Sequence, residues 1–153
     1  MMISVEIQWR RGDAVFTDNK YSRCHVWEFD GGAQVRASSS PHIVPLPMSD
    51  PHAVDPEEAF VASLSSCHML CFLSIAAKQN FIVDDYRDDA IGQMGRNSDG
   101  KLVMTLVELR PAIRWSSSRV PTDAEIRDMH HQAHEECFIA NSVKTEVRVF
   151  PAL

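Results

Sequence analysis

The chain has 153 residues, of which 44% are apolar and 24% are charged, and its formal net charge is −6 at pH 7. This length and composition predict one soluble globular domain over residues 1–153, large enough to bury a core. The negative charge and the scattered basic residues argue against a nucleic-acid partner, which would need a basic patch. The opening residues MMISVEIQWRRGD hold no apolar stretch typical of a secretory signal, so we expect a cytoplasmic protein with reduced thiols.

The first part of the chain predicts short strands followed by a loop. Residues 3–9 alternate apolar and polar side chains, as a half-buried strand does. Residues 23–39 predict a hairpin that turns at Asp30-Gly31-Gly32. Five prolines in residues 40–56 exclude regular structure there, and we expect a loop that forms one wall of a pocket.

A helix is predicted from Asp55 to about Gln79. Asp55 is a good N-cap, Pro56 suits the first helical position, and Glu58 can close a capping box. The helix is apolar on most faces but carries serines, cysteines and a histidine, so we interpret it as a buried helix rather than a membrane span. Such a helix needs cover all round, which predicts a homodimer.

The second part of the chain predicts two long strands, a helix and a last strand. Residues 81–95 and 101–115 are strand-like and are joined by the turn sequence RNSDG. Thr122 and Glu125 form a capping box for a second helix that ends near residue 136, and residues 141–150 alternate as a strand does. The predicted order is therefore β-β-β-α-β-β-α-β, an α+β fold with an antiparallel sheet and a long buried central helix.

The stretch SSCHMLC places Cys67 and Cys71 one helical turn apart, and three interpretations of these thiols are open. They can pack in the core as small hydrophobic side chains, bind a metal, or supply a nucleophile. Two cysteines one turn apart make a poor disulfide, so a disulfide partner for Cys67 should come from elsewhere in the fold. Cys137, just past the second helix, is the candidate for that partner.

A metal site would draw on Cys67, His68, Cys71, His134 and Cys137. Their spacing lacks the tight C-x₂-C pattern of zinc sites, and His130 and His134 lack the intervening Glu of a zincin. The sequence also has no glycine-rich phosphate loop and no G-x-S-x-G hydrolase motif. We therefore expect neither a metal nor a cofactor.

The stretch DPEEAFVASLSSC resembles the OsmC/Ohr family of organic hydroperoxide reductases. The family signature is Asn/Asp-Pro-Glu at the start of the central helix, followed ten residues after that Glu by a reactive cysteine. Glu57 and Cys67 fit this spacing, Cys137 fits the family's second cysteine, and Arg23 in YSRCH fits its arginine before the second strand. The element order matches the family's fold, an intertwined homodimer with its sites at the subunit interface.

This resemblance implies a thiol peroxidase that acts on alkyl or lipid hydroperoxides. Cys67 would attack the peroxide and become a sulfenic acid, Cys137 would resolve it as a disulfide, and an external dithiol would reduce that disulfide. Arg23 would lower the pKa of the thiol and hold the peroxide, and Glu57 would orient Arg23. Ten residues of helix rise about 15 Å, so Glu57 cannot touch Cys67 along one straight helix.

The chain departs from the family pattern around both cysteines. His68 follows Cys67, Cys71 is an additional thiol, Cys24 lies beside Arg23, and the proline-rich loop is long. We therefore expect a member of the OsmC-like subgroup rather than a typical Ohr enzyme. The alternative function is a binding or redox-sensing protein for an apolar or electrophilic ligand, without peroxidase turnover.

Overall fold

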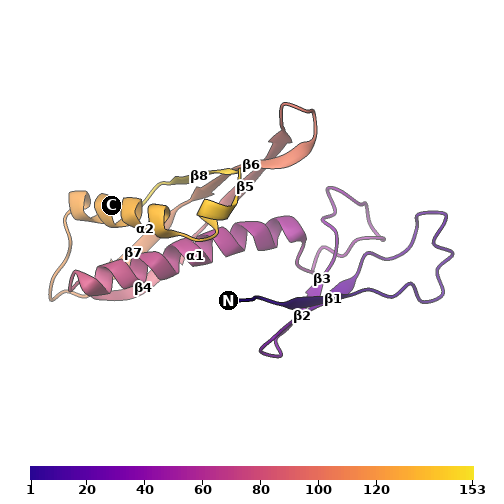
Figure 1. Ribbon diagram of the computed structural model, residues 1–153, viewed down its shortest axis with the longest axis horizontal. Coiled ribbons are helices and arrows are strands. Elements are labelled where there is room, and N and C mark those ends of the chain that lie inside the picture. The colour runs from indigo at the N-terminus through magenta and orange to yellow at the C-terminus, as the bar shows by residue number, and fades with distance from the viewer. The chain divides into compact units, whose positions relative to one another are not determined.

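The protein is described by a computed structural model that covers residues 1–153. Its elements run in chain order through β1 (Val5–Gln8), β2 (His25–Phe29), β3 (Gln34–Ala37), α1 (Pro56–Lys78), β4 (Val83–Asp88), β5 (Ile91–Arg96), β6 (Leu102–Leu109), β7 (Pro111–Trp115), α2 (Asp123–Glu136), the 3₁₀ helix η1 (Ala140–Ser142) and β8 (Glu146–Val149) (Figure 1). The α+β class and the two helices are confirmed. The chain divides into two compact units, Met1–Ala59 and Phe60–Leu153, and a single domain over residues 1–153 stays a prediction.

The first unit contains an antiparallel sheet of three strands in the order β1-β2-β3. The hairpin between β2 and β3 turns where the sequence predicts it, and Gly32 adopts φ +86°, which an L side chain rarely tolerates. The loop that follows is tied back to β3, because Ser38 N donates to Val54 O at 3.0 Å. The predicted hairpin and the irregular proline-rich loop are both confirmed.

Helix α1 begins and ends for the reasons that its sequence predicts. Glu58 N donates to Asp55 Oδ1 at 2.8 Å, and Asp55 N donates to Glu58 Oε2 at 3.1 Å, so the capping box is closed. The helix ends at Lys78, and Asn80 takes a left-handed conformation with φ +61°. Asparagine tolerates this conformation better than most residues, which makes it a suitable C-terminal stop.

The second unit contains two sheets where the sequence predicts two continuous strands. Residues 81–95 divide into β4 and β5, and residues 101–115 divide into β6 and β7. β4 pairs with β7 in one sheet, and β5 pairs with β6 in another. Where β6 gives way to β7, Arg110 N donates to Asp88 Oδ1 at 2.6 Å. A side-chain oxygen there takes the place of the backbone carbonyl that would accept this bond in a continuous sheet.

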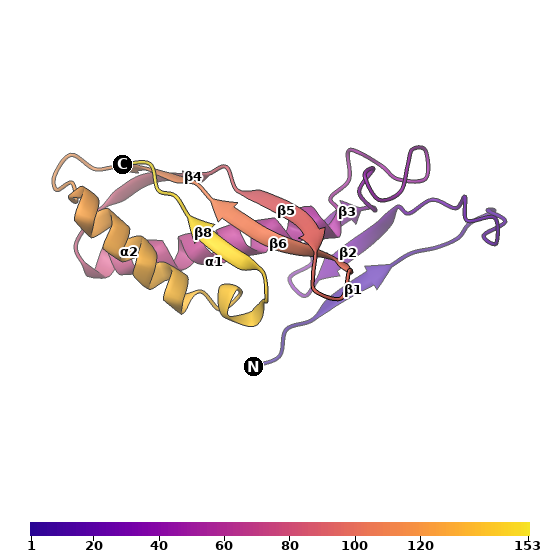
Figure 2. The same cartoon turned by 90° about the horizontal axis from the view of Figure 1, so that it is seen from above.

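The last strand pairs differently from the prediction of an antiparallel sheet. β8 lies beside β6 and runs parallel to it, so the sheet that contains β5 and β6 has the order β5-β6-β8 (Figure 2). The chain leaves β7, passes through α2 and returns in the direction of β6. A helical crossover of this kind joins parallel strands, whereas a short turn joins antiparallel ones.

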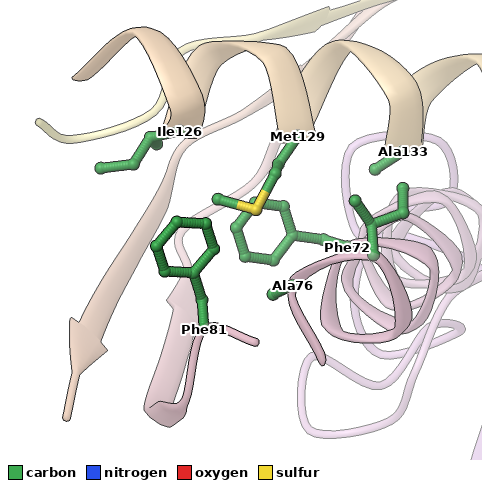
Figure 3. Packing of buried hydrophobic residues seen from close by; sticks show 7 residues of the cluster. Phe72, Ala76, Phe81, Ile126, Met129 and Ala133 are labelled. Carbon is green, nitrogen blue, oxygen red and sulfur yellow. The ribbon is translucent and has the colours of Figure 1, made fainter. Parts of the chain in front are cut away.

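Two clusters of apolar side chains hold the second unit together. One cluster joins α1 to α2 and to Phe81, which follows the end of α1 (Figure 3). Its buried members are Phe72, Ile75, Ala76, Phe81, Ile126, Met129 and Ala133. The other joins α1 to the β5-β6-β8 sheet through Leu64, Val107 and Leu109. At Gly92 of β5, an added Cβ would lie 2.6 Å from Val61 Cγ2, so glycine permits the close approach of helix and sheet.

Helix α1 is covered on one side only within this chain. Its buried residues are Leu64, His68, Phe72, Ile75 and Ala76, whereas Leu70 is 61% exposed. By length and composition alone the helix could also cross a membrane, a test that core helices of soluble proteins pass too. The predicted burial is therefore confirmed for one stripe of the helix, and the predicted homodimer stays a prediction.

The interface between α1 and α2 contains a buried pair of histidines. His68 Nε2 and His130 Nδ1 are 3.0 Å apart, and the two side chains are 0% and 2% exposed. The ring of His130 also stacks on Phe72, with 4.1 Å between centroids. Burial lowers the pKa of His68 to about 4 and that of His130 to about 3, so both rings are neutral at pH 7.

We expect this pair to make the protein sensitive to acid. An unfolded histidine takes up a proton near pH 6.5, whereas the folded His68 does so only near pH 4. Between these values the unfolded chain binds more protons, so the free energy of unfolding falls as the pH falls, by roughly 3 kcal/mol for His68 alone. Urea unfolding measured between about pH 7 and about pH 4 checks this expectation.

The matched variants for this measurement are His68→Gln and His131→Gln. The first removes the buried titrating ring, and the second alters an exposed histidine on α2. The His68→Gln protein should lose less stability between the two pH values than the wild type, whereas His131→Gln should follow the wild type. Parallel pH profiles for all three proteins would contradict the assignment.

Candidate functional site

The packing of α1 against α2 brings two of the four candidate site residues together. Cys67 lies on α1, five residues before Phe72, and Cys137 is the C-cap residue of α2. The Cys137 thiol hydrogen-bonds to the Cys67 sulfur, and both cysteines are free thiols. Two residues seventy positions apart in the sequence therefore share one site.

The sulfur of Cys67 is surrounded by hydrogen-bond donors. Burial acts to raise its pKa, but hydrogen bonds from Cys137, from the backbone N–H of Ile139 and Phe138, and from Cys71 outweigh burial. The pKa of Cys67 is therefore lowered from its ordinary value. None of these donors is a cation, so within this unit neutral dipoles stabilise the thiolate.

Cys137 is the complementary partner in this contact. Its side chain is 1% exposed, and burial, together with its hydrogen bond to Cys67, raises its pKa to about 11. The backbone N–H of Ala140 donates to Cys137 Sγ at 3.4 Å, which fixes the side chain at the start of η1. The pair thus consists of a half-buried thiol whose pKa is lowered and a buried thiol whose pKa is raised.

Arg23 is held by its own neighbours in the first unit. Its Nη1 donates to Asn19 O at 3.1 Å and to Tyr21 O, and its Nη2 donates to Asn19 Oδ1 at 2.8 Å. Its guanidinium lies over the Tyr21 ring, 3.7 Å from the centroid. Because a guanidinium has five N–H groups, the Nε–H and one Nη2–H have no partner within the chain.

Glu57 lies in the first turn of α1 and has an unusual environment for a helix-start glutamate. Its Oε2 is buried and has no hydrogen-bond partner within the chain. A buried carboxylate oxygen without a donor is costly, so this atom is suited to a cationic or N–H partner. Glu57 and Cys67 are ten residues apart on one continuous helix, a rise of about 15 Å, as the sequence predicts.

The residues of the hypothetical metal site are engaged differently. His68 pairs with His130 in the core, while Cys67 and Cys137 hydrogen-bond to each other. No group of three or more His, Cys, Asp or Glu side chains is arranged to hold a metal ion.

Sequence reasoning missed two parts of this site. The backbone N–H groups of Phe138 and Ile139 carry no side-chain signal, because any residue can supply them. The pairing of His68 with His130 has no spacing signal either, since the two residues come from different helices. The signals that pointed to this region were the two cysteines of SSCHMLC, the spacing of Glu57 and Cys67, and the position of Cys137 after the second helix.

Comparisons with known proteins agree with the fold. The model of the family described as OsmC-like protein matches residues 49–150, which is two thirds of the chain. The chain belongs to the OsmC-like family. An OsmC-like protein of unknown function from Vibrio cholerae O1 biovar eltor is 56% identical, with a TM-score of 0.97 and 99% of both chains covered.

More distant structures of the family share the fold alone. An organic hydroperoxide resistance protein OsmC from Legionella pneumophila is 15% identical, with a TM-score of 0.72, and 100% of this chain and 98% of that chain are covered. The organic hydroperoxide resistance protein OhrB of Bacillus subtilis is 14% identical, with a TM-score of 0.68, and 99% and 98% are covered. No curated protein sequence matches the chain significantly.

The contrast between the two paired thiols leads to a direct expectation for alkylation. Because the thiolate is the nucleophile, Cys67 should react with iodoacetamide at neutral pH much faster than Cys137, whose pKa is about 11. Peptide mass spectrometry after timed alkylation measures both rates. In denaturant the two cysteines should react at equal rates, and equal rates in the folded protein would contradict the site described here.

Proposed function

We propose that this protein is a thiol peroxidase that reduces organic hydroperoxides, with Cys67 as the attacking thiolate and Cys137 as the resolving thiol. The observation that carries this proposal is the hydrogen bond between the two thiols, with the pKa of Cys67 lowered and that of Cys137 raised. The first step requires a sulfur that ionises, and the second requires a neighbouring thiol that gives up its proton as it attacks the sulfenic acid.

The two steps balance as follows. The Cys67 thiolate attacks the outer oxygen of the hydroperoxide, the O–O bond breaks, and the alkoxide leaves and takes up a proton to become an alcohol. Cys67 is then a sulfenic acid. The sulfur of Cys137 displaces hydroxide from it, so that a disulfide forms and one water molecule is released. An external dithiol restores both thiols by disulfide exchange and is itself oxidised.

Arg23 and Glu57 are proposed to complete the site. The free Nε–H and Nη2–H of Arg23 form the side-on pair that binds two oxygens of a carboxylate or a peroxide. The unpartnered Oε2 of Glu57 is an acceptor for such a guanidinium. We propose that Glu57 orients Arg23, and that Arg23 stabilises the charge on the departing oxygen.

A homodimer is part of the same proposal. The side of α1 that carries Leu70 is exposed in the single chain, and burial of the Leu70 side chain, which is 61% exposed, by a second copy would be favourable. We propose that the sites lie at the interface of such a dimer, in the cytoplasm, where thiols remain reduced. Apolar surroundings of this kind favour alkyl or lipid hydroperoxides over hydrogen peroxide.

The test is consumption of cumene hydroperoxide with dithiothreitol as the reductant. The wild type should turn over, Cys67→Ser should be inactive, and Cys137→Ser should lose most of its dithiol-dependent turnover. Cys24→Ser is the matched control, because Cys24 is a free thiol that takes no part in the proposed steps, and it should keep the wild-type rate. Hydrogen peroxide should be consumed more slowly than cumene hydroperoxide by the wild type.

Failure of this test has a definite meaning. If the wild type consumes no hydroperoxide while Cys67 remains the fast-alkylating thiol, the peroxidase proposal is wrong. The fold and the thiol pair would then fit a protein that binds or senses an apolar or electrophilic ligand without turnover. Equal activity of the wild type and Cys67→Ser would show that Cys67 is neither the attacking thiolate nor a sensing thiol.

A further inference from the structure

A cavity of about 510 Å³ is lined by α2 on one side and by β8 and the residues that follow it on the other. Its volume is in the range of pockets that hold small molecules. None of the four cysteines lines it, so the proposed peroxidase steps leave this cavity unused.

The wall formed by α2 is polar and carries a cation. It consists of Arg127, His130, His131 and His134, which lie on one face of the helix at spacings of three and four residues. Arg127 is exposed and forms no ion pair within the chain. Its charge is therefore available to an anion in the cavity.

Two histidine nitrogens of this wall are buried and lack a partner. His130 is 2% exposed, and its Nδ1 lies 3.0 Å from His68 Nε2, whereas its own Nε2 has no hydrogen-bond partner. Nδ1 of His134 is also buried without a partner. A buried polar atom left unpaired costs free energy, so these nitrogens are suited to a polar group of a ligand.

The histidine pair can supply the donor that an anion needs. A neutral imidazole carries one N–H, and both rings are neutral at pH 7. When His68 Nε2–H donates to His130 Nδ1, the proton of the His130 ring lies on Nε2. An anion beside His130 favours this tautomer, because Nε2–H then donates to it.

The opposite wall is apolar. Val147 and Val149 are alternate residues of β8 and therefore lie on the same face of the strand. Phe150 and Leu153 continue this wall and are 51% and 55% exposed. An apolar group that covers these side chains would be removed from water together with them, which is favourable.

We propose that this cavity binds a small carboxylate with an apolar tail. Arg127 pairs with the carboxylate, His130 Nε2–H donates to it, and the tail lies against Val149 and Phe150. The proposal goes beyond the proposed peroxidase function and does not depend on it, since it requires neither Cys67 nor Cys137.

Octanoate is the probe for this site, and its binding is followed by NMR on the full-length protein labelled with ¹⁵N. Arg127→Gln removes the cation. Arg148→Gln is the matched control, because Arg148 lies on β8 between the two valines but on the other face of the strand, where it pairs with Glu146. Acetate lacks the apolar tail, and octan-1-ol lacks the charge.

We expect saturable binding of octanoate, with shifts of the amide signals of α2 and β8 and of the His130 side-chain nitrogens. Arg127→Gln should weaken binding roughly three- to fivefold, as expected for an ion pair at an exposed site. Arg148→Gln should bind as the wild type does, and acetate and octan-1-ol should both bind more weakly than octanoate.

Three results would overturn the proposal. They are the absence of saturable octanoate binding, shifts confined to other elements such as the exposed side of α1, and equal binding of octanoate by the wild type and Arg127→Gln. Octan-1-ol that binds as tightly as octanoate would likewise exclude recognition of a carboxylate. No peroxide is present in these titrations, so their outcome and that of the peroxidase test are independent.

Discussion

The hydrogen bond between Cys137 and Cys67 is the contact on which the chemistry of this protein depends. It exists because α2 ends at Cys137, where the chain turns into η1 and presents the N–H groups of Phe138 and Ile139 to the same sulfur. The Cys67 thiolate is therefore stabilised by dipoles that folding fixes in place. Such fixed dipoles lose little orientation entropy when charge develops, which makes them effective in a partly buried site.

The core beneath this contact explains why the two helices keep their relative position. Phe72 packs against residues of α2, and the His68–His130 pair adds a buried polar link one turn away. Because the neutral imidazoles tolerate burial and the charged ones do not, the same link makes the helix pair dependent on pH. Stability and thiol chemistry thus share one helix interface.

The sequence predicted this fold well wherever a local rule applies. The capping boxes at Asp55 and Thr122, the hairpin at Gly32 and the number of helices all depend on neighbouring residues, and the structure has each of them. The prediction was wrong about β8, because its parallel pairing with β6 depends on a crossover through α2 rather than on its own residues. The division of the two long strands was missed for a similar reason.

For the candidate site, too, the sequence predicted what depends on neighbouring residues and missed what depends on contacts between distant segments. Helical spacing places Cys71 next to Cys67, and the position of Cys137 after the second helix makes it a candidate partner, but only the packed helices bring the two sulfurs into contact. Backbone donors and the histidine pair leave no pattern in the sequence. The roles of Arg23 and Glu57 stay predictions, supported by the free N–H groups of one and the unpartnered oxygen of the other.

The most direct measurement counts the thiols by intact mass before and after one equivalent of cumene hydroperoxide and maps any disulfide by peptide mass spectrometry. The account predicts the loss of two thiols, a single bridge between Cys67 and Cys137, and a sulfenic acid on Cys67 when Cys137 is replaced by serine. Survival of all four thiols, or a bridge that does not include Cys67, would contradict the account.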